Sequence, residues 1–329
     1  MQQEINNLQD QIEQTYPKIM EVISEVHKKV VGQDDLIEWL LIALLAKWHI
    51  LLEWVPGLAK TLSVDSLSKT MDLWFSRIQF TPDLLPSDLI WTEIFNSKTQ
   101  EFKTKFWPVF SNFILADEIN RAPSKVQSAL LEAMAEKQIT IWDQTYKLQE
   151  PFIVLATQNP LEQSWTYKLP EAQMDRFLLK IDVDYPNKED ELNIYKKFSD
   201  GFWETINKVL TRDDIFEIQN IIQSIYVSDK IFDYVYEIID STRNPEMYNL
   251  EEIKNYIDYW VSPRWWLALI SSAKVIAFLN KRTFIVPEDI KQVAENVLSH
   301  RLWLTYEAIA DEIWVKDIIQ KIIEQIKVI

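Results

Sequence analysis

Short apolar segments alternate with helical segments in the first part of the chain, and this alternation constrains the fold most strongly. The apolar segments are residues 49–53, 75–80, 113–116 and 152–156, and helical stretches such as Ser124–Glu136 separate them. Short continuous apolar runs are typical of parallel strands that helices cover on both faces. The pattern therefore predicts an α/β fold with a parallel sheet flanked by helices.

The pattern changes after residue 186. Before it, residues 139–141 and 144–146 flank Trp142-Asp143, which predicts a β-hairpin with a two-residue turn inserted before the last strand. After it, no strand is expected, and amphipathic helices follow, one of which opens with Pro287 in its first turn. We therefore predict a larger domain at residues 1–187 and a smaller, all-helical domain at residues 188–329.

The charge and composition limit the classes of function. The chain has 34 Lys and Arg against 50 Asp and Glu, a net charge of −16, which disfavours a nucleic-acid partner. Residues 1–29 are charged throughout, and the longest apolar run, residues 40–46, is too short to span a bilayer. We expect a cytoplasmic protein without a membrane span. The absence of cysteine excludes disulfides and thiolate metal sites.

A candidate phosphate loop follows the first predicted strand. Residues 54–61 read Trp-Val-Pro-Gly-Leu-Ala-Lys-Thr and lead into a helical run. A phosphate loop needs converging backbone N–H groups, a lysine for the outer phosphates and a hydroxyl for Mg²⁺, and Gly57, Lys60 and Thr61 fit these roles. Trp54 and Ala59, however, occupy the two glycine positions of the general pattern. Alone, the segment is also compatible with an ordinary helix start.

Polar groups also follow two other predicted strands. Asp117 and Glu118 follow the strand at residues 113–116, and Asn159 comes three residues after the strand at residues 152–156. One acid can hold Mg²⁺, the next can activate a water, and the amide can position that water. A solvated strand end is the alternative for the acids alone. Three such strand ends would converge at the carboxyl edge of a parallel sheet, where these folds bind ligands.

These motifs resemble those of the MoxR family of AAA+ ATPases. The resemblance extends from about residue 30 to residue 306 and combines several specific segments. They are residues 31–33 (Val-Gly-Gln), 55–61, 77–88, 115–123 (Leu-Ala-Asp-Glu-Ile-Asn-Arg-Ala-Pro), 156–160, 169–177 and 262–264 (Ser-Pro-Arg). The resemblance implies a P-loop AAA+ sheet domain followed by a helical lid domain, with ATP and Mg²⁺ as cofactors.

The resemblance assigns roles to residues of the phosphate loop and of the strand after it. Lys60 is the Walker A lysine, Thr61 and Asp117 hold Mg²⁺, and Glu118 is the catalytic base. The nucleotide-contacting loop is Trp54, Val55, Pro56, Gly57, Leu58, Ala59, Lys60 and Thr61.

Further roles fall outside that loop. Asn159 corresponds to sensor 1, and Val31 and Gly32 border the adenine. Arg176 corresponds to the arginine finger offered to a neighbouring subunit, and Arg264 to the sensor 2 arginine. Either arginine can instead belong to a structural ion pair.

Glycine and tryptophan usage depart from expectation together. Average usage predicts about 7% glycine, roughly 23 residues in a chain of this length, but the chain has 3 Gly and 14 Trp. Tryptophan stands where the family has glycine at positions 48, 54, 91, 107, 142, 165, 260, 266 and 303. Bulky residues disfavour the tight turns expected at Trp54 and Trp142. We therefore hypothesise that the source organism decodes UGA as glycine, which this sequence renders as tryptophan.

Several functions are compatible with these residues. The first is Mg²⁺-dependent ATP hydrolysis by a ring, a hexamer, that remodels or matures client proteins, with a von Willebrand factor A domain protein as partner; the family resemblance implies it. The second is a degenerate nucleotide-binding scaffold with little turnover, which Trp54 favours. The third is a motor subunit related to magnesium chelatase. The intact Lys60, Asp117, Glu118, Asn159 and Arg176 favour turnover.

Overall fold

The computed structural model describes most of the chain. The described residues are 2–54, 60–96, 101–106, 108–141, 144–158, 167, 169–183, 187–199, 204–259 and 264–327. They form two compact units. One unit comprises residues 18–177 and 181–216, and the other comprises residues 1–17, 178–180 and 217–329. The last change from one unit to the other, between residues 216 and 217, falls within the helix at residues 212–223.

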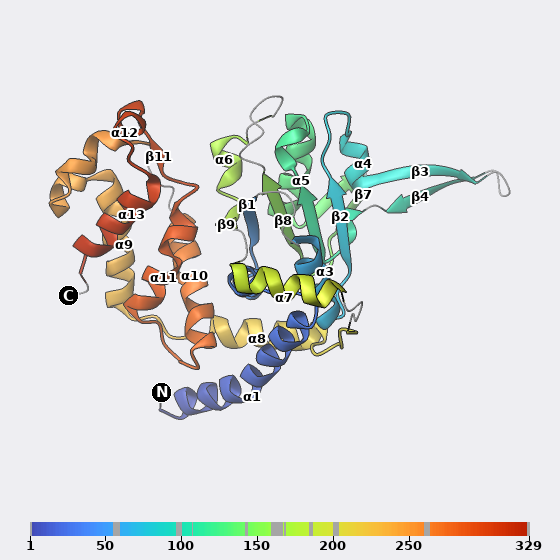
Figure 1. The fold of residues 1–329 in the computed structure, drawn as a ribbon, viewed down its shortest axis with the longest axis horizontal. Coiled ribbons are helices and arrows are strands. Elements are labelled where there is room, and N and C mark those ends of the chain that lie inside the picture. The colour runs from blue at the N-terminus through green and yellow to red at the C-terminus, as the bar shows by residue number, and fades with distance from the viewer. Residues whose placement is uncertain are drawn as a thin grey trace. The chain divides into compact units, whose positions relative to one another are not determined.

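The first unit is built on a five-stranded sheet in the order β2-β5-β8-β1-β9 (Figure 1). The pairs β2–β5, β5–β8 and β8–β1 are parallel. The strands are β1 (His49–Trp54), β2 (Phe75–Gln79), β5 (Phe113–Asp117), β8 (Ile153–Gln158) and β9 (Phe177–Val183). All five side chains of β5 are buried, as expected for a central strand covered on both faces. The predicted α/β fold class is confirmed.

Helices and short 3-10 turns connect the strands of this unit. They are α2 (Asp34–Leu45), α3 (Lys60–Thr70), α4 (Pro86–Ile90), α5 (Ser124–Glu136), α6 (Glu171–Met174) and α7 (Lys188–Ser199), with 3-10 turns η1 (Pro108–Phe110) and η2 (Ile119–Arg121). Helices α1 (Gln2–His27) and α8 (Arg212–Gln223) each have residues in both units. Helix α5 buries Val126, Leu130 and Met134 at helical spacing, together with the strand residues Ile114 and Val154. The periodic apolar face therefore explains why α5 packs on the sheet.

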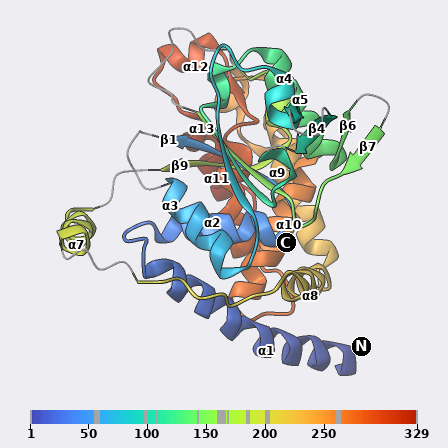
Figure 2. The same ribbon diagram turned by 90° about the vertical axis from the view of Figure 1, so that its right-hand side faces the viewer.

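Two hairpins extend this unit. Strands β6 (Gln138–Ile141) and β7 (Gln144–Lys147) form the antiparallel pair predicted before β8, and Figure 2 shows it projecting from the sheet. The predicted turn residues Trp142-Asp143 lie outside the described residues. Strands β3 (Trp91–Asn96) and β4 (Glu101–Phe106) form a second antiparallel pair that reaches out from the β2 side (Figure 1). The sequence analysis missed this second hairpin.

The second unit is helical apart from one short strand pair. It contains α9 (Asp229–Arg243), α10 (Arg264–Leu279), α11 (Pro287–Leu298), α12 (Tyr306–Ala310) and α13 (Val315–Gln325), with 3-10 turns η3 (Pro245–Tyr248) and η4 (Glu251–Tyr256). Strands β10 (Ile257–Tyr259) and β11 (Trp303–Leu304) pair antiparallel, which the sequence analysis did not expect after residue 186. Within the described part of the chain, no helix has the length and apolar character to cross a bilayer.

Candidate functional site

Asp117, the last residue of β5, lies at the centre of a charged network at the sheet edge. Its side chain is 2% exposed. The carboxylate accepts hydrogen bonds from Lys60 Nζ, from Thr157 Oγ1 at 2.7 Å and from Arg77 Nη2 at 2.6 Å. Burial by itself raises the pKa of Asp117, but the hydrogen bonds from these three residues outweigh it and hold the pKa below its usual value. Asp117 is therefore ionised at neutral pH.

The strand register brings these groups together. Gln79 at the end of β2 pairs with Asp117, and Ala116 of β5 pairs with Ala156 of β8, so that Thr157 follows beside Asp117. Parallel strands present their carboxyl ends at one edge of the sheet. The register thus places Thr157 of β8 beside Asp117, while Asn159, the residue after β8 that was predicted to join the site, lies outside the described residues.

Glu118 has an unusual backbone conformation. Its φ of 58° and ψ of 49° lie in the left-handed region, which costs a non-glycine residue about 1–2 kcal/mol. The Glu118 N–H donates to Thr157 Oγ1 at 2.9 Å. Gln79 Nε2 donates to Glu118 Oε2 at 2.8 Å, and Arg121 Nε lies 3.1 Å from the same oxygen. These contacts fix the direction of the Glu118 carboxylate next to Asp117.

Lys60 is the first residue of α3, and Thr61 is the second. The first turn of α3 contains no acidic residue. A helix N-terminus directs free N–H groups and a partial positive charge outward, and Lys60 adds a full charge there. This end of α3 is therefore suited to bind an anion. Val55, Pro56, Gly57, Leu58 and Ala59 lie outside the described residues, as does the side chain of Trp54, whose backbone ends β1.

The residues with predicted sensor, finger and adenine roles are distributed over both units. Asn159 lies outside the described residues. Arg176 is half-buried, and its Nη1 donates to the Leu131 carbonyl of α5. Arg264 is exposed and begins α10 in the second unit.

The segment predicted to border the adenine contains a glycine that the backbone requires. Val31 and Gly32 are half-buried. Gly32 has a φ of +70°, and a Cβ placed there would lie 2.5 Å from Asp190 Cβ in α7. Both the conformation and the close approach therefore demand glycine at this position.

Sequence reasoning missed four groups of the network. They are Arg77 and Gln79 on β2, Thr157 on β8, and Arg121, which was not assigned a role. For Arg77 and Gln79, the local signal in the sequence was polar character at two alternate positions of β2. That pattern alone indicates a solvated face and gives no hint that the side chains reach the neighbouring strand.

The donor atoms at this edge suit Mg²⁺ bound together with a phosphate ligand. Mg²⁺ prefers oxygen ligands and is usually held by one or two carboxylates, waters and substrate phosphates. Asp117 supplies a carboxylate of lowered pKa, and the predicted second protein ligand is the Thr61 hydroxyl. Within the described ranges, no group of three His, Cys, Asp or Glu side chains could hold an ion on its own. The residues present thus fit a nucleotide-bound Mg²⁺.

Backbone angles bear on the tryptophan positions. Among the described residues, positive φ at a residue other than glycine occurs only at Lys47, Asp72, Glu118, Lys137, Asn249, Lys281 and Glu312. No tryptophan among the described residues has a positive φ. Trp48, for example, follows Lys47, a left-handed residue two positions after the end of α2, and the Trp48 N–H donates to Ala43 O at 3.0 Å. Trp107, Trp142, Trp165 and Trp260 lie outside the described residues.

Comparison with known proteins agrees with this geometry. Residues 49–179 match the family model for the ATPase family associated with various cellular activities, and residues 251–322 match that for the AAA lid domain. The chain is 44% identical to Chaperone MoxR1 of Mycobacterium tuberculosis, over 92% of this chain and 80% of that protein. It is 40% identical to YeaC of Bacillus subtilis, over 96% of both chains.

A solved structure extends the similarity to the whole fold. A crystal structure from Cytophaga hutchinsonii superposes with a TM-score of 0.94 and 50% identity, and the superposition covers 99% of both chains. The sequence relatives, the sheet with its lid and the acidic edge at Asp117 agree with one another. The chain belongs to the MoxR family of AAA+ ATPases.

Proposed function

We propose that this protein binds ATP and Mg²⁺ at the carboxyl edge of the sheet and hydrolyses the nucleotide. The observation that carries the proposal is the network around the buried, ionised Asp117, which joins the start of α3 to the ends of β2, β5 and β8. A structural ion pair would need one cation, whereas Asp117 receives Lys60 and Arg77 together. Such an excess of positive charge suits a polyphosphate ligand.

The residues at this edge have separate roles in the proposal. Lys60 donates to the outer phosphates from the N-terminus of α3, while Thr61 and Asp117 hold the metal ion. Bound Mg²⁺ neutralises charge on the phosphates. Glu118 accepts the proton of the attacking water, and its contacts with Gln79 and Arg121 orient the carboxylate for that transfer.

Other roles extend the proposal to the rest of the chain. Asn159 positions the water, Val31 and Gly32 border the adenine, and residues 54–59 complete the phosphate loop. Arg176 acts as the finger toward a neighbouring subunit, and Arg264 is the sensor arginine. The partial exposure of Arg176 supports a role at a subunit edge, although its present hydrogen bond to Leu131 would have to be exchanged.

The energy of hydrolysis serves chaperone-like remodelling in this proposal. A relative of 44% identity is named as a chaperone, which supports this role. The working form is a ring, a hexamer, in the cytoplasm, and its partner is a client protein such as a von Willebrand factor A domain protein, with no nucleic acid involved. We also propose the functional division at residues 1–187 and 188–329.

Replacing Glu118 tests the proposal. Glu118→Gln keeps the size of the side chain and removes the base, so ATP binding should persist while turnover falls at least about 100-fold. Glu136→Gln, at the exposed end of α5, is the matched control and should leave turnover unchanged. Phosphate release and equilibrium nucleotide binding are measured for all three chains. Full turnover in Glu118→Gln would show that Glu118 is not the catalytic base. Nucleotide binding without turnover in the parent chain would favour the alternative function, a degenerate nucleotide-binding scaffold.

A further inference from the structure

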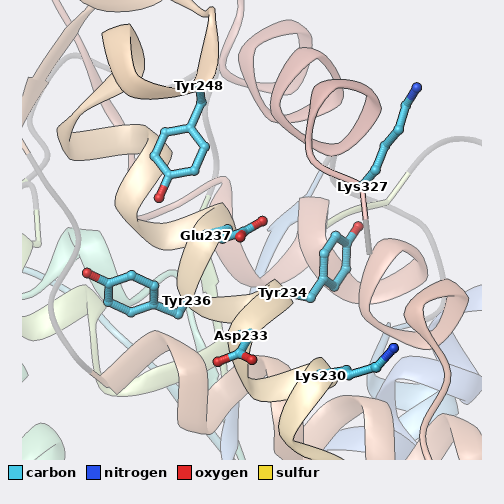
Figure 3. A pocket seen from close by; sticks show the side chains of 7 residues that line it. All are labelled: Lys230, Asp233, Tyr234, Tyr236, Glu237, Tyr248 and Lys327. Atoms are coloured by element: carbon cyan, nitrogen blue, oxygen red, sulfur yellow. The ribbon is translucent and has the colours of Figure 1, made fainter. Parts of the chain in front are cut away.

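A polar cavity of about 270 Å³ lies in the helical unit. Its floor is the helix α9, which contributes Lys230, Asp233, Tyr234, Tyr236 and Glu237 (Figure 3). Tyr248 of η3 and Lys327, which follows α13, complete the lining. In the view of Figure 3, Lys230, Tyr234 and Lys327 lie on one side, and Asp233, Tyr236 and Tyr248 lie on the other. The cavity is large enough for one side chain and the adjoining backbone of a peptide.

Tyr234 has a buried hydroxyl without a hydrogen-bond partner among the described residues. The residue is 2% exposed, and its hydroxyl is one of the few buried side-chain atoms left unpaired. Burial, with a smaller contribution from Glu288, raises the pKa of Tyr234 to about 12. The hydroxyl therefore keeps its proton at neutral pH and lacks an acceptor. An unsatisfied buried donor is costly to the folded state, so it points to a group supplied from outside.

Two lysines on the same side have no ionic partner in the described part of the chain. Lys230 and Lys327 are exposed, and neither forms an ion pair or hydrogen bond there. Tyr248 differs, because its hydroxyl already donates to Asp240 at 2.9 Å. The unused donors are thus Tyr234, Lys230 and Lys327, and together they suit a carboxylate.

The acidic residues on the opposite side of the cavity restrict which acidic ligands can bind. Asp233 and Glu237 are one helical turn apart on α9, and neither forms a hydrogen bond or ion pair with the described residues. They repel a ligand with several negative charges, but they can accept N–H groups of a peptide backbone. A peptide carrying a single acidic side chain satisfies both sides.

We propose that this cavity of the helical unit binds a partner polypeptide through one acidic side chain, with the carboxylate at Tyr234, Lys230 and Lys327. The proposal does not depend on the nucleotide chemistry, because every residue that carries it belongs to the helical unit. It assigns this unit a role in partner binding.

Short blocked alanine peptides with one central glutamate, glutamine or lysine are the probes, and calorimetry with the full chain is the measurement. The glutamate peptide should bind at least tenfold more tightly than the other two. Tyr234→Phe should weaken its binding several-fold, while the ligand-free variant should melt at the same or a higher temperature than the parent, since only an unpaired hydroxyl is lost. The combined Lys230→Gln and Lys327→Gln variant should also bind weakly.

Tyr306→Phe is the matched control, because Tyr306 is 90% exposed and does not line the cavity. It should bind the glutamate peptide like the parent chain. Preference for the lysine peptide, equal binding of all three peptides, no binding of any, or unchanged affinity in Tyr234→Phe would each overturn the proposal. If N-acetylglutamate bound as tightly as the glutamate peptide, the proposed contribution of the peptide backbone to binding would be overturned.

Discussion

Acid should destabilise the sheet-containing unit through His49, because the structure accommodates only one neutral form of this side chain. His49 starts β1 and is 6% exposed. The Val154 N–H donates to its Nδ1 at 3.0 Å, so the proton must be on Nε2, which donates to Met134 O at 3.2 Å. A second proton on Nδ1 would break the bond from Val154 and place an unpaired charge inside the protein.

The size of the effect follows from the pKa. Burial lowers the pKa of His49 to about 4, with Lys137 adding to the effect and the bond to Met134 opposing it. The unfolded chain has the ordinary value of about 6.5. Above this value both states are neutral, and no stability is lost. As the pH falls below 6.5, the unfolded state binds the proton first, which reduces the free energy of unfolding by about 2 kcal/mol at pH 5 and about 3 kcal/mol near pH 4.

Nuclear magnetic resonance of the histidine ring protons measures the pKa directly, since the chain has only 3 histidines. His49→Gln identifies the signal by its loss. The same variant is the control for urea unfolding at pH 7.5 and pH 5, because it removes the His49 imidazole and keeps all other titratable groups. The parent chain should lose about 2 kcal/mol more than the variant between these pH values. Titration of His49 near 6.5, or equal losses in both chains, would refute the reasoning.

Further predictions concern other residues. Gly32→Ala should destabilise the chain by at least about 1–2 kcal/mol in urea unfolding, because φ is +70° and the new Cβ meets Asp190; Asp190→Gly in the same chain should recover part of this loss. Arg176→Ala should lower ATP turnover about 1,000-fold without weakening nucleotide binding, and unaltered turnover would exclude a finger role. Peptides from the native host should contain tryptophan at position 265, which is 2% exposed, and glycine at position 266, where Trp266 is 40% exposed; tryptophan at both would remove position 266 from the recoding hypothesis.

The central strands and the covering helix were predictable from local pattern. Helix α5 has the predicted bounds, Ser124–Glu136, and the four strands of the apolar segments differ from prediction by one or two residues at their ends. The apolar runs of β5 and β8 are continuous because both faces of these strands are buried, whereas β2 is partly exposed and contains polar residues. In contrast, β9 was missed because only three apolar residues precede Lys180, as suits an edge strand. The pair β3–β4 contains no continuous apolar run, so its segment resembled a loop.

The residues of the candidate site were predictable where they belong to motifs of neighbouring residues. They were not predictable where they come together only through the order of the strands in the sheet. Lys60, Asp117 and Glu118 occur in motifs that can be recognised from neighbouring residues. Arg77 and Thr157 approach Asp117 only because β2 and β8 flank β5, and the sequence does not specify that order. Equally, the left-handed conformation of Glu118 has no signature in residue type.

Phosphate release from ATP by the protein purified from its native host, with and without Mg²⁺, tests the central claim most directly. The matched variant is Lys60→Ala, which removes the cation at the start of α3 that contacts Asp117. The account predicts release that requires Mg²⁺ and is lost in the variant. No release by the native protein, or release that continues unchanged in Lys60→Ala, would contradict it.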